Sequence, residues 1–444
     1  MDRLLYRVKE IECFHTLLEN VNNFHLHKGG PEIIYVSGTL KAGKTFLLDE
    51  VQRSAAARGI PVSRVDFSPN AEIVTDGYRR EKVGDRYAGE TSKITLIQSI
   101  MDGLIRAADA VPSRYVRPDD LPQTAIEVFI EYNHWLKGFL NRSTMLIFDH
   151  LDMAPPEIHN WLMTALIPAA VEASQKPINM YGPAPTLMAL AGRKPLYDLQ
   201  PTMPWSALRK TKELPIRPFT REQTKTMAKK DIYPLTGGLP GLIQYIKQLS
   251  DDELDPTEQI KNVVEQVILP EIPLDKPDGL FAIAALHLVD IPTLIAISGG
   301  KTREEAWKIL RPLILAGVVL DHPDGYGHQI VEGLRIPLHT YSRDIQPNLF
   351  VQANEVAAVH SAYEIQQGDF SSVLELLWSR ACLGDDIRKL EELMKDTLKA
   401  AASHLSKDRL ATLKSKIDTA VAGEDFKNML PSGAIASLRR IATS

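Results

Sequence analysis

The chain has 444 residues, 44% of them hydrophobic and 24% charged, with a formal net charge of −5. This length and composition predict a globular protein of about two to four domains, and the negative charge argues against non-specific nucleic-acid binding. Only two cysteines, Cys13 and Cys382, are present, which excludes a disulfide framework and favours a reducing compartment.

The N-terminal segment has apolar residues at helical spacing, so we expect an amphipathic helix over residues 3–27. It lacks the long apolar core of a secretory signal. The most apolar stretch of the chain, 281–298, is interrupted by His287, Asp290 and Pro292, so no membrane-spanning helix is expected. These features predict a cytoplasmic protein without a membrane partner.

The next segment contains a phosphate-binding motif. Residues 38–45 read Gly-Thr-Leu-Lys-Ala-Gly-Lys-Thr, which matches G-x-x-x-x-G-K-[ST]. The apolar run 33–36 predicts a strand before the loop, and residues 44–57 have helical periodicity after it. In such a loop backbone amides wrap the phosphates, the lysine adds charge, and the threonine hydroxyl can ligate Mg²⁺. The predicted nucleotide contacts are Gly38, Ala42, Gly43, Lys44, Thr45 and Phe46, with ATP or ADP and Mg²⁺ as ligands.

Alternating strands and helices follow as far as about residue 220, as in an α/β sheet built from βαβ units. Polar or Pro-rich stretches at 69–90, 112–122 and 175–185 are expected to be loops. We expect strands at 61–67, 145–149, 186–191 and 212–216, the last weakened by Pro215, and helices at 92–109, 123–140 and 156–173, the last interrupted near Pro168.

Two of these predicted strands end in charged residues. Asp149 follows four apolar residues, as a Walker-B acid that positions Mg²⁺ would. Many ATPases place a glutamate next, whereas this chain has His150. Asp152 is the nearest acid that could orient water for attack on the γ-phosphate, and Glu157 is the next candidate. If neither residue acts as the base, the protein would be a slow, switch-like nucleotide binder. The second of these charged residues, Arg193, follows the strand at 186–191 and is predicted to sense the γ-phosphate.

Beyond residue 220 the pattern is mainly helical. Residues 221–270 are expected to be helices, and the Pro-rich segment 270–279 is a predicted domain boundary. A winged-helix pattern comes next, with helices at 280–288, 292–298 and 302–316, a strand at 318–320, a turn at 324–325 and a strand ending at Ile336. From residue 347 the chain is predicted to be all helical, with breaks near Gly368, Gly384 and Gly423.

Taken together, these motifs resemble the STAND class of P-loop ATPases, AAA+-related signal-transduction proteins that include the NLR immune switches. The resemblance covers about residues 3–345. It rests on the R-x-x-E segment 7–11, the phosphate loop, the segments 145–152, 191–193 and 214–220, and Gly238-Leu239-Pro240.

The resemblance implies a nucleotide-driven switch. Pro240 would pack near the adenine, the Arg7 region would contribute to the base pocket, and His339 would contact the β-phosphate of ADP. The implied fold is an α/β P-loop NTPase core with a parallel sheet, followed by a helical lid, a winged helix and an all-α C-terminal region. The corresponding domains are 1–220, 221–275, 276–345 and 346–444. The long repeat array typical of the family is absent or reduced to about 100 residues.

The predicted function is therefore ATP binding and hydrolysis that drives oligomerisation or recruits a protein partner in signalling or defence. The charged helices 386–399 and 405–419 are most simply solvated faces of a helical bundle, and docking of such a partner through them is the alternative interpretation.

The less favoured alternative is a DNA-associated AAA+ ATPase of the initiator or transposition-regulator type. Helix 302–316 offers basic residues for DNA, whereas nearby acids oppose phosphate binding. The basic residues are Lys301, Arg303, Lys308 and Arg311, and the acids are Glu304, Glu305, Asp321 and Asp324. A third reading is a scaffold that binds nucleotide only for stability.

Overall fold

The protein is described by a computed structural model in which two compact units are present. The first contains Met1–Gly38 and Ala42–Arg217, and the second contains Thr39–Lys41 and Pro218–Ser444. Each is described by itself. The structure describes residues 7–22, 32–68, 88–108, 126–127, 129–130, 133–134, 137, 143–174, 177–179, 182–183, 185–199, 201–249, 255–272, 274, 276–298, 302–322 and 327–443.

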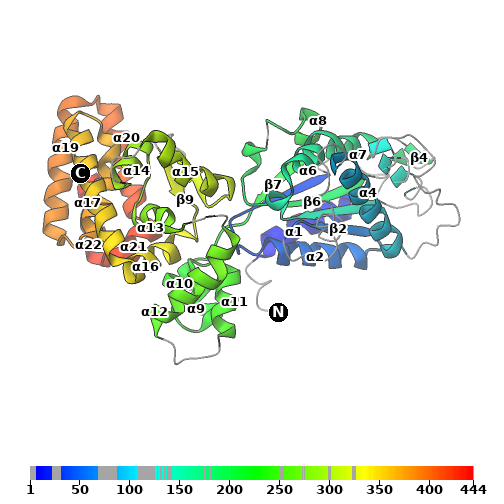
Figure 1. Cartoon of the computed structure of the whole chain (residues 1–444), viewed down its shortest axis with the longest axis horizontal. Helices are drawn as coiled ribbons and strands as arrows, with labels where there is room; N and C mark the ends of the chain where they lie inside the picture. The colour runs from blue at the N-terminus through cyan, green and yellow to red at the C-terminus, as the bar shows by residue number, and fades with distance from the viewer. Residues whose placement is uncertain are drawn as a thin grey trace. The chain divides into compact units, whose positions relative to one another are not determined.

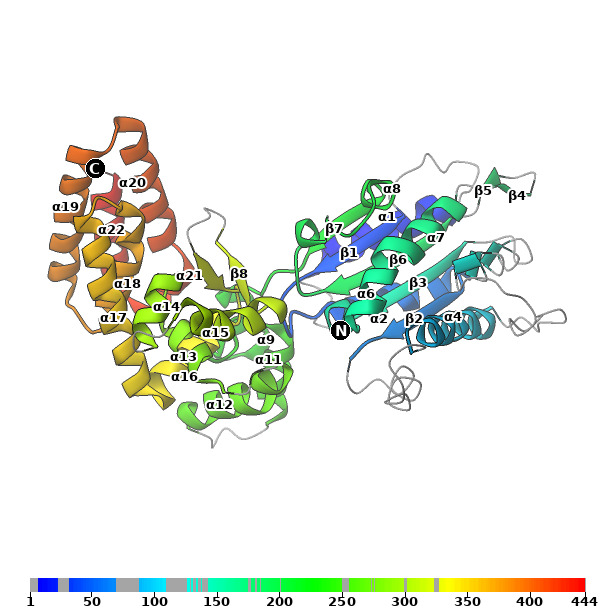
Figure 2. The ribbon, with the colours of Figure 1, turned by 45° about the horizontal axis from the view of Figure 1, so that its top comes forward.

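The first unit is built on a five-stranded sheet (Figures 1 and 2). All four neighbouring pairs are parallel, so the carboxyl ends of the strands share one edge. In spatial order the strands are β2 (Val62–Asp66), β3 (Thr144–Asp149), β6 (Thr186–Gly192), β1 (Ile33–Ser37) and β7 (Thr211–Pro215). The central strands are buried along their whole length, which explains their continuous apolar sequences.

Helices cover both faces of this sheet. One face packs against α2 (Lys44–Ala57), on which α1 (Val8–Asn22) lies. The other packs against α4 (Ala88–Ala107), α6 (Pro156–Trp161), α7 (Ile167–Ser174) and α8 (Trp205–Leu208), and the two layers are visible in Figure 1. Alternate strand residues supply the two cores, since successive side chains point to opposite faces. The predicted α/β P-loop fold is confirmed.

Four details of the first unit differ from the prediction or refine it. Pro215 is accommodated because β7 is an edge strand that pairs only with β1 among the described strands. The 156–173 helix is continuous through α6, a π-helical segment, Leu162–Leu166, and α7, and this irregular segment directly precedes Pro168, which cannot donate the backbone hydrogen bond of a regular helix. The predicted loop at 175–185 contains a short hairpin, β4 (Pro177–Asn179) and β5 (Gly182–Pro183). The predicted loop at 69–90 ends too late, since α4 begins at Ala88; its residues 69–87 and the predicted loop at 112–122 lie outside the described residues.

The second unit begins with a group of short helices. Gly237 and Gly238 have positive φ values of 54° and 74°, and they make the tight turn that separates the second helix from the third. The helices are α9 (Arg221–Ala228), α10 (Tyr233–Thr236), α11 (Pro240–Gln248) and α12 (Pro256–Asn262), the last continuing into a π-helical segment, Val263–Ile268.

Three helices and a hairpin follow, in the order of the predicted winged helix. They are α13 (Asp278–Ala285), α14 (Ile291–Ile297), α15 (Arg303–Leu315), β8 (Val319–Asp321) and β9 (His328–Ile330). The prediction of a strand ending at Ile336 is wrong: β9 ends at Ile330, and Ile336 lies in helix α16 (Arg335–Ile345). Pro337 lies in the first turn of this helix, where proline is tolerated.

The remaining chain is helical. The predicted breaks near Gly368, Gly384 and Gly423 are confirmed, and the first two residues have φ values of 91° and 85°. The helices are α17 (Pro347–Gln366), α18 (Val373–Cys382), α19 (Ile387–His404), α20 (Lys407–Val421), α21 (Glu424–Met429) and α22 (Ser432–Thr443). Among the described residues, no helix is long and apolar enough to cross a membrane.

Arg335 joins the hairpin-bearing part of this unit to its C-terminal helices. Its side chain is buried and forms an ion pair with Asp425 of α21 at 3.1 Å. It also donates to the carbonyl oxygens of Leu286 and His287, and its guanidinium lies 5.0 Å from the Trp378 ring centroid. One buried cation therefore links the segment after α13 to α18 and α21.

Candidate nucleotide-binding site

The carboxyl edge of the sheet gathers the charged residues of the first unit. Parallel register places the ends of β2 and β3 side by side, with Asp66 opposite Asp149. The ends of β1 and β6 are also neighbours, with Ser37 opposite Gly192, so the loop after β1 and Arg193 after β6 start from adjacent positions. Ligands of open α/β sheets bind at this edge.

The loop that follows β1 has the shape its sequence predicts. Gly43 has φ 93° and forms the N-cap of α2, which starts at Lys44. A Cβ atom on Gly38 would lie 2.8 Å from the Ile216 carbonyl oxygen, so only glycine fits there without a shift. Lys44 Nζ donates to the Gly38 carbonyl oxygen at 2.7 Å and closes the loop. The backbone N–H groups at the start of α2 are therefore available to bind an anion, and the partial positive charge of the helix N-terminus favours it.

Arg7 supports this loop from one side. Only 9% of the residue is exposed, and it donates to the carbonyl oxygens of Ala42 at 3.3 Å and Arg217 at 2.7 Å. Burial lowers the pKa of its guanidinium, and the neighbouring Glu10 carboxylate opposes that shift. Arg7 thus ties the phosphate loop to the segment after β7. Its predicted contact with a base remains a prediction.

Asp149 is fully buried and held by two partners. Its Oδ2 accepts from Arg64 at 2.7 Å, and its Oδ1 accepts from the His150 backbone N–H at 2.9 Å. Arg64 also pairs with Asp49 of α2. Burial alone would lower the pKa of Arg64, but its two carboxylate partners raise it. The predicted Walker-B acid is therefore paired with a cation, Arg64, that sequence reasoning did not identify.

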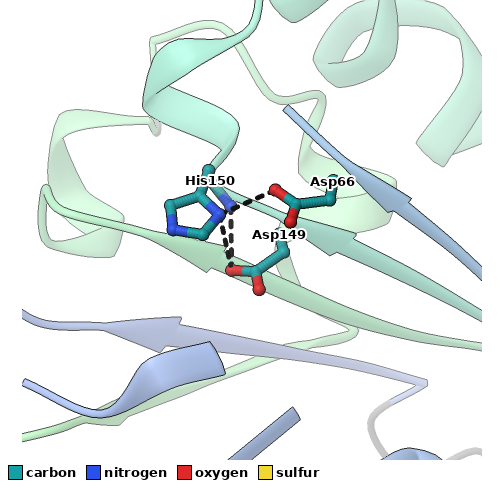
Figure 3. Close-up of side chains that lie close together, drawn as sticks. All are labelled: Asp66, Asp149 and His150. Atoms are coloured by element: carbon teal, nitrogen blue, oxygen red, sulfur yellow. Dashed lines mark hydrogen bonds and ion pairs between the residues drawn. The ribbon is translucent and has the colours of Figure 1, made fainter. Parts of the chain in front are cut away.

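His150 and Asp66 form a second pair beside this carboxylate (Figure 3). His150 has φ 53°, which turns its ring back so that Nδ1 lies 2.8 Å from Asp66 Oδ1 and 3.5 Å from Asp149 Oδ1. Burial alone would raise the pKa of Asp66, but hydrogen bonds from His150 and Ser68 lower it to about 2. Burial would likewise lower the pKa of His150, but its hydrogen bond to Asp66 and the charges of both aspartates raise it.

The two predicted catalytic residues contact each other. Arg193 Nε lies 2.9 Å from Asp152 Oδ2, and the Arg193 backbone N–H donates to Asp152 Oδ1 at 3.0 Å. Their side chains are 4% and 10% exposed. This pairing joins the end of β6 to the short 3-10 turn after β3, Leu151–Met153. The catalytic roles predicted for these residues stay predictions.

The remaining predicted contacts lie in the second unit. Pro240 is the first residue of α11, and the N–H of the next residue, Gly241, donates to the Lys41 carbonyl oxygen at 3.0 Å. His339 lies on α16, with its ring 5.2 Å from both the Phe350 and Trp378 rings. Burial lowers the pKa of His339 to about 3, so it is neutral at pH 7. Its predicted contact with a diphosphate is untested.

The residues at the sheet edge fit a magnesium nucleotide. Asp66 and Asp149 offer the carboxylate oxygens that Mg²⁺ prefers, and their ligand atoms lie within 4.8 Å of each other and of a His150 nitrogen. The Thr45 hydroxyl, at the start of α2, supplies another oxygen of the right kind.

Sequence reasoning missed three of these residues: Asp49, Arg64 and Asp66. Asp66 ends a strand that was predicted, so its position at the sheet edge could have been inferred. Its closeness to Asp149 depends on β2 neighbouring β3, which is a long-range property. The link from Asp49 to Asp149 through Arg64 likewise depends on how α2 packs on the sheet.

No protein-family model matches the chain, and no curated protein sequence matches it. Several solved structures are weakly similar. Cdc6p from Pyrobaculum aerophilum is 14% identical, with 77% of this chain and 94% of that one covered and a TM-score of 0.38. The ADP form of the Aeropyrum pernix ORC2 protein is 13% identical, with 77% of this chain and 93% of that one covered and a TM-score of 0.43.

A chain of Drosophila ORC bound to DNA gives 12% identity, covers 76% of this chain and 86% of that one, and has a TM-score of 0.30. Similarity at this level assigns no function.

Proposed function

We propose that the protein is a Mg²⁺-dependent ATPase. The observation that carries the proposal is the convergence at one sheet edge of a closed phosphate loop, its Lys44, and a buried acid, Asp149, that contacts Arg64. Lys44 and the amides at the start of α2 bind the β- and γ-phosphates, and Thr45 and Asp149 hold the metal. Bound magnesium would neutralise charge on the phosphates.

Asp152 and Arg193 are the proposed catalytic pair. A carboxylate can orient water, and a cation at the neighbouring strand end can stabilise charge on the γ-phosphate. Their mutual ion pair at 2.9 Å fixes both side chains. In this assignment, nucleotide that reaches Arg193 competes with Asp152 for the guanidinium, so binding and hydrolysis are coupled.

Calorimetry and a phosphate-release assay test this assignment. Lys44→Ala is expected to weaken Mg-ATP binding at least tenfold, because the lysine charge on the phosphates is lost. Asp152→Asn should keep binding and lose turnover. Wild-type affinity in Lys44→Ala would refute the loop as the site, and full turnover in Asp152→Asn would assign the base elsewhere.

We further propose that the ATPase acts on DNA, as in the AAA+ initiator alternative, and that α15 is the contact. The exposed residues of α15 include three basic residues and one aromatic residue. They are Arg303, Lys308, Arg311 and Trp307. The Trp307 ring packs edge-on at 6.1 Å against His328 of β9 and joins helix and hairpin in one surface. Basic side chains around an exposed aromatic ring suit a nucleic-acid backbone.

The acids that oppose DNA binding are partly engaged. Glu305 is held in a capping box with Thr302, and Asp321 pairs with His328 at 2.8 Å. Lys301 and Asp324 lie outside the described residues. The STAND-type switch is less well supported, because it needs His339 on a phosphate, whereas the described ring contacts of His339 are with Phe350 and Trp378.

Fluorescence anisotropy with a labelled duplex tests the DNA assignment. Lys308→Glu/Arg311→Glu should weaken binding at least tenfold and lower the salt slope by about two, because two phosphate contacts are lost. The matched control is Lys395→Glu/Lys399→Glu, two exposed lysines of α19, which should bind normally. Absence of wild-type binding at low salt, combined with an ATP-dependent increase in mass, would favour the nucleotide switch instead.

A further inference from the structure

A second group of metal-ligating side chains lies in the second unit. Asp290, His360 and Glu364 each offer one ligand atom, and these three atoms lie within 4.8 Å of one another. His360 and Glu364 are one turn apart on α17, so both point to the same side of that helix. Asp290 is the N-cap of α14, which packs against α17.

The histidine nitrogen in this group is left without a hydrogen bond. His360 Nε2 is sealed from solvent, and it has no hydrogen-bond partner among the described residues, although Glu364 Oε1 lies only 3.2 Å away. His360 Nε2 and Glu364 Oε1 thus approach each other without the geometry of a hydrogen bond. A cation that both atoms ligate would account for the approach.

The surroundings also favour a cation. A cavity of about 250 Å³ opens beside the group, and every charged residue among its described lining is acidic. The acids are Asp290, Glu364, Asp369 and Glu375, and the described part of the lining contains no lysine, arginine or histidine. Carboxylates crowded in a partly enclosed space repel one another unless a positive charge compensates them.

The described hydrogen bonds of the two carboxylates engage only one oxygen of each, so the other oxygen can bind a metal ion. Asp290 Oδ1 accepts from the Thr293 backbone N–H at 2.6 Å, which fixes the carboxylate as the cap of α14. Ser372 Oγ contacts Glu364 Oε2 and so orients the other oxygen, Oε1, toward His360. Each carboxylate is thus positioned through one oxygen, as supporting groups do in metal sites.

From this geometry we propose that Asp290, His360 and Glu364 form a binding site for a divalent transition-metal ion. One imidazole and two carboxylates are ligands suited to Zn²⁺, whereas Mg²⁺ and Ca²⁺ prefer oxygen alone. Three protein ligands leave a fourth position for water, on the side of the acidic cavity. The ion would link α14 to α17.

Zinc titration of the metal-free, full-length protein tests this site, with Zn²⁺ itself as the probe. His360→Gln and Asp290→Asn are each expected to lose one bound equivalent or to weaken its affinity at least tenfold. Two controls should keep that equivalent. His404→Gln alters another helical histidine, exposed on α19, and Asp149→Asn removes a ligand of the separate cluster at the sheet edge.

Hydrogen exchange of the wild-type chain supplies a readout that needs no variant. Zn²⁺ should slow exchange in peptides that cover residues 286–298 and 355–367, and a chelator should reverse the effect. Zinc stoichiometry and affinity that are both unchanged in His360→Gln, or exchange in these two segments that is insensitive to Zn²⁺, would overturn the proposal.

Discussion

At the scale of single residues, buried carboxylates behave in two ways in this protein. Asp149 has Arg64 at 2.7 Å and a backbone amide on its other oxygen. Glu375 is also buried, but it accepts mainly from N–H groups of Leu288 and His287. Burial raises the pKa of Glu375 to about 7, and its hydrogen bonds and the Arg335 charge only partly oppose the shift. Among the described residues no cation pairs directly with Glu375, so burial dominates its pKa.

Glu375 should therefore make folding less favourable as pH rises. Below pH 4.5 its carboxyl is protonated in both the folded and the unfolded chain. Between that pH and about 7 the unfolded chain releases the proton while the folded chain keeps it, so stability falls, and above 7 the loss is complete. Wild type should lose roughly 2–3 kcal/mol more than Glu375→Gln between pH 5 and pH 8.

Urea unfolding of both chains at the two pH values measures that difference. The comparison uses the change with pH rather than absolute stability, because glutamine presents an amide group to one of the backbone donors. Equal pH dependence in the two chains would contradict the assignment.

At the scale of elements, apolar runs predicted the strands of the first unit because each central strand is buried on both faces. The order of those strands, and with it the meeting of Arg64, Asp66 and Asp149, depends on long-range pairing that periodicity does not contain. The second strand of the wing ends at Ile330 rather than at the predicted Ile336. A short apolar run fits a helix as well as a strand, so the sequence pattern did not separate the two.

The turn between α10 and α11 gives a sharp test of backbone geometry. Gly238 has φ 74°, and a Cβ there would lie 1.9 Å from the Phe219 carbonyl oxygen; Gly384 has φ 85° and nothing within 4 Å of its Cβ position. Gly384→Ala should cost roughly 1 kcal/mol, from left-handed strain alone. Gly238→Ala should cost roughly 2–4 kcal/mol, because the backbone must also shift.

Thermal or denaturant unfolding of the two alanine variants provides the measurement. Equal losses in both would show that φ strain, rather than crowding against Phe219, sets the requirement for glycine at position 238.

At the scale of the whole molecule, the two units have cores of their own. One cluster surrounds the sheet and includes Phe148 and Leu190, and another lies among the C-terminal helices and includes Trp378 and Phe426. Separate cores can unfold in separate transitions. The predicted nucleotide ligands Lys44, Thr45 and Asp149 belong to the first unit.

Scanning calorimetry should therefore show unequal effects of nucleotide. Mg-ATP at about one hundred times its Kd should stabilise the transition of the first unit by about 2.7 kcal/mol. The transition of the second unit should move much less, and Lys44→Ala should abolish the response. An equal shift of both transitions would instead mean that nucleotide couples the units tightly.

The buried Arg335 limits how this protein can be dissected. A fragment that stops before residue 425 would lack the carboxylate that pairs with this guanidinium and would leave a buried cation without its ion-pair partner. Shortened versions made to study α15 and its hairpin should therefore run past α21. Alternatively, position 335 could be replaced by an uncharged residue such as methionine, which would make the truncated piece tolerate the loss.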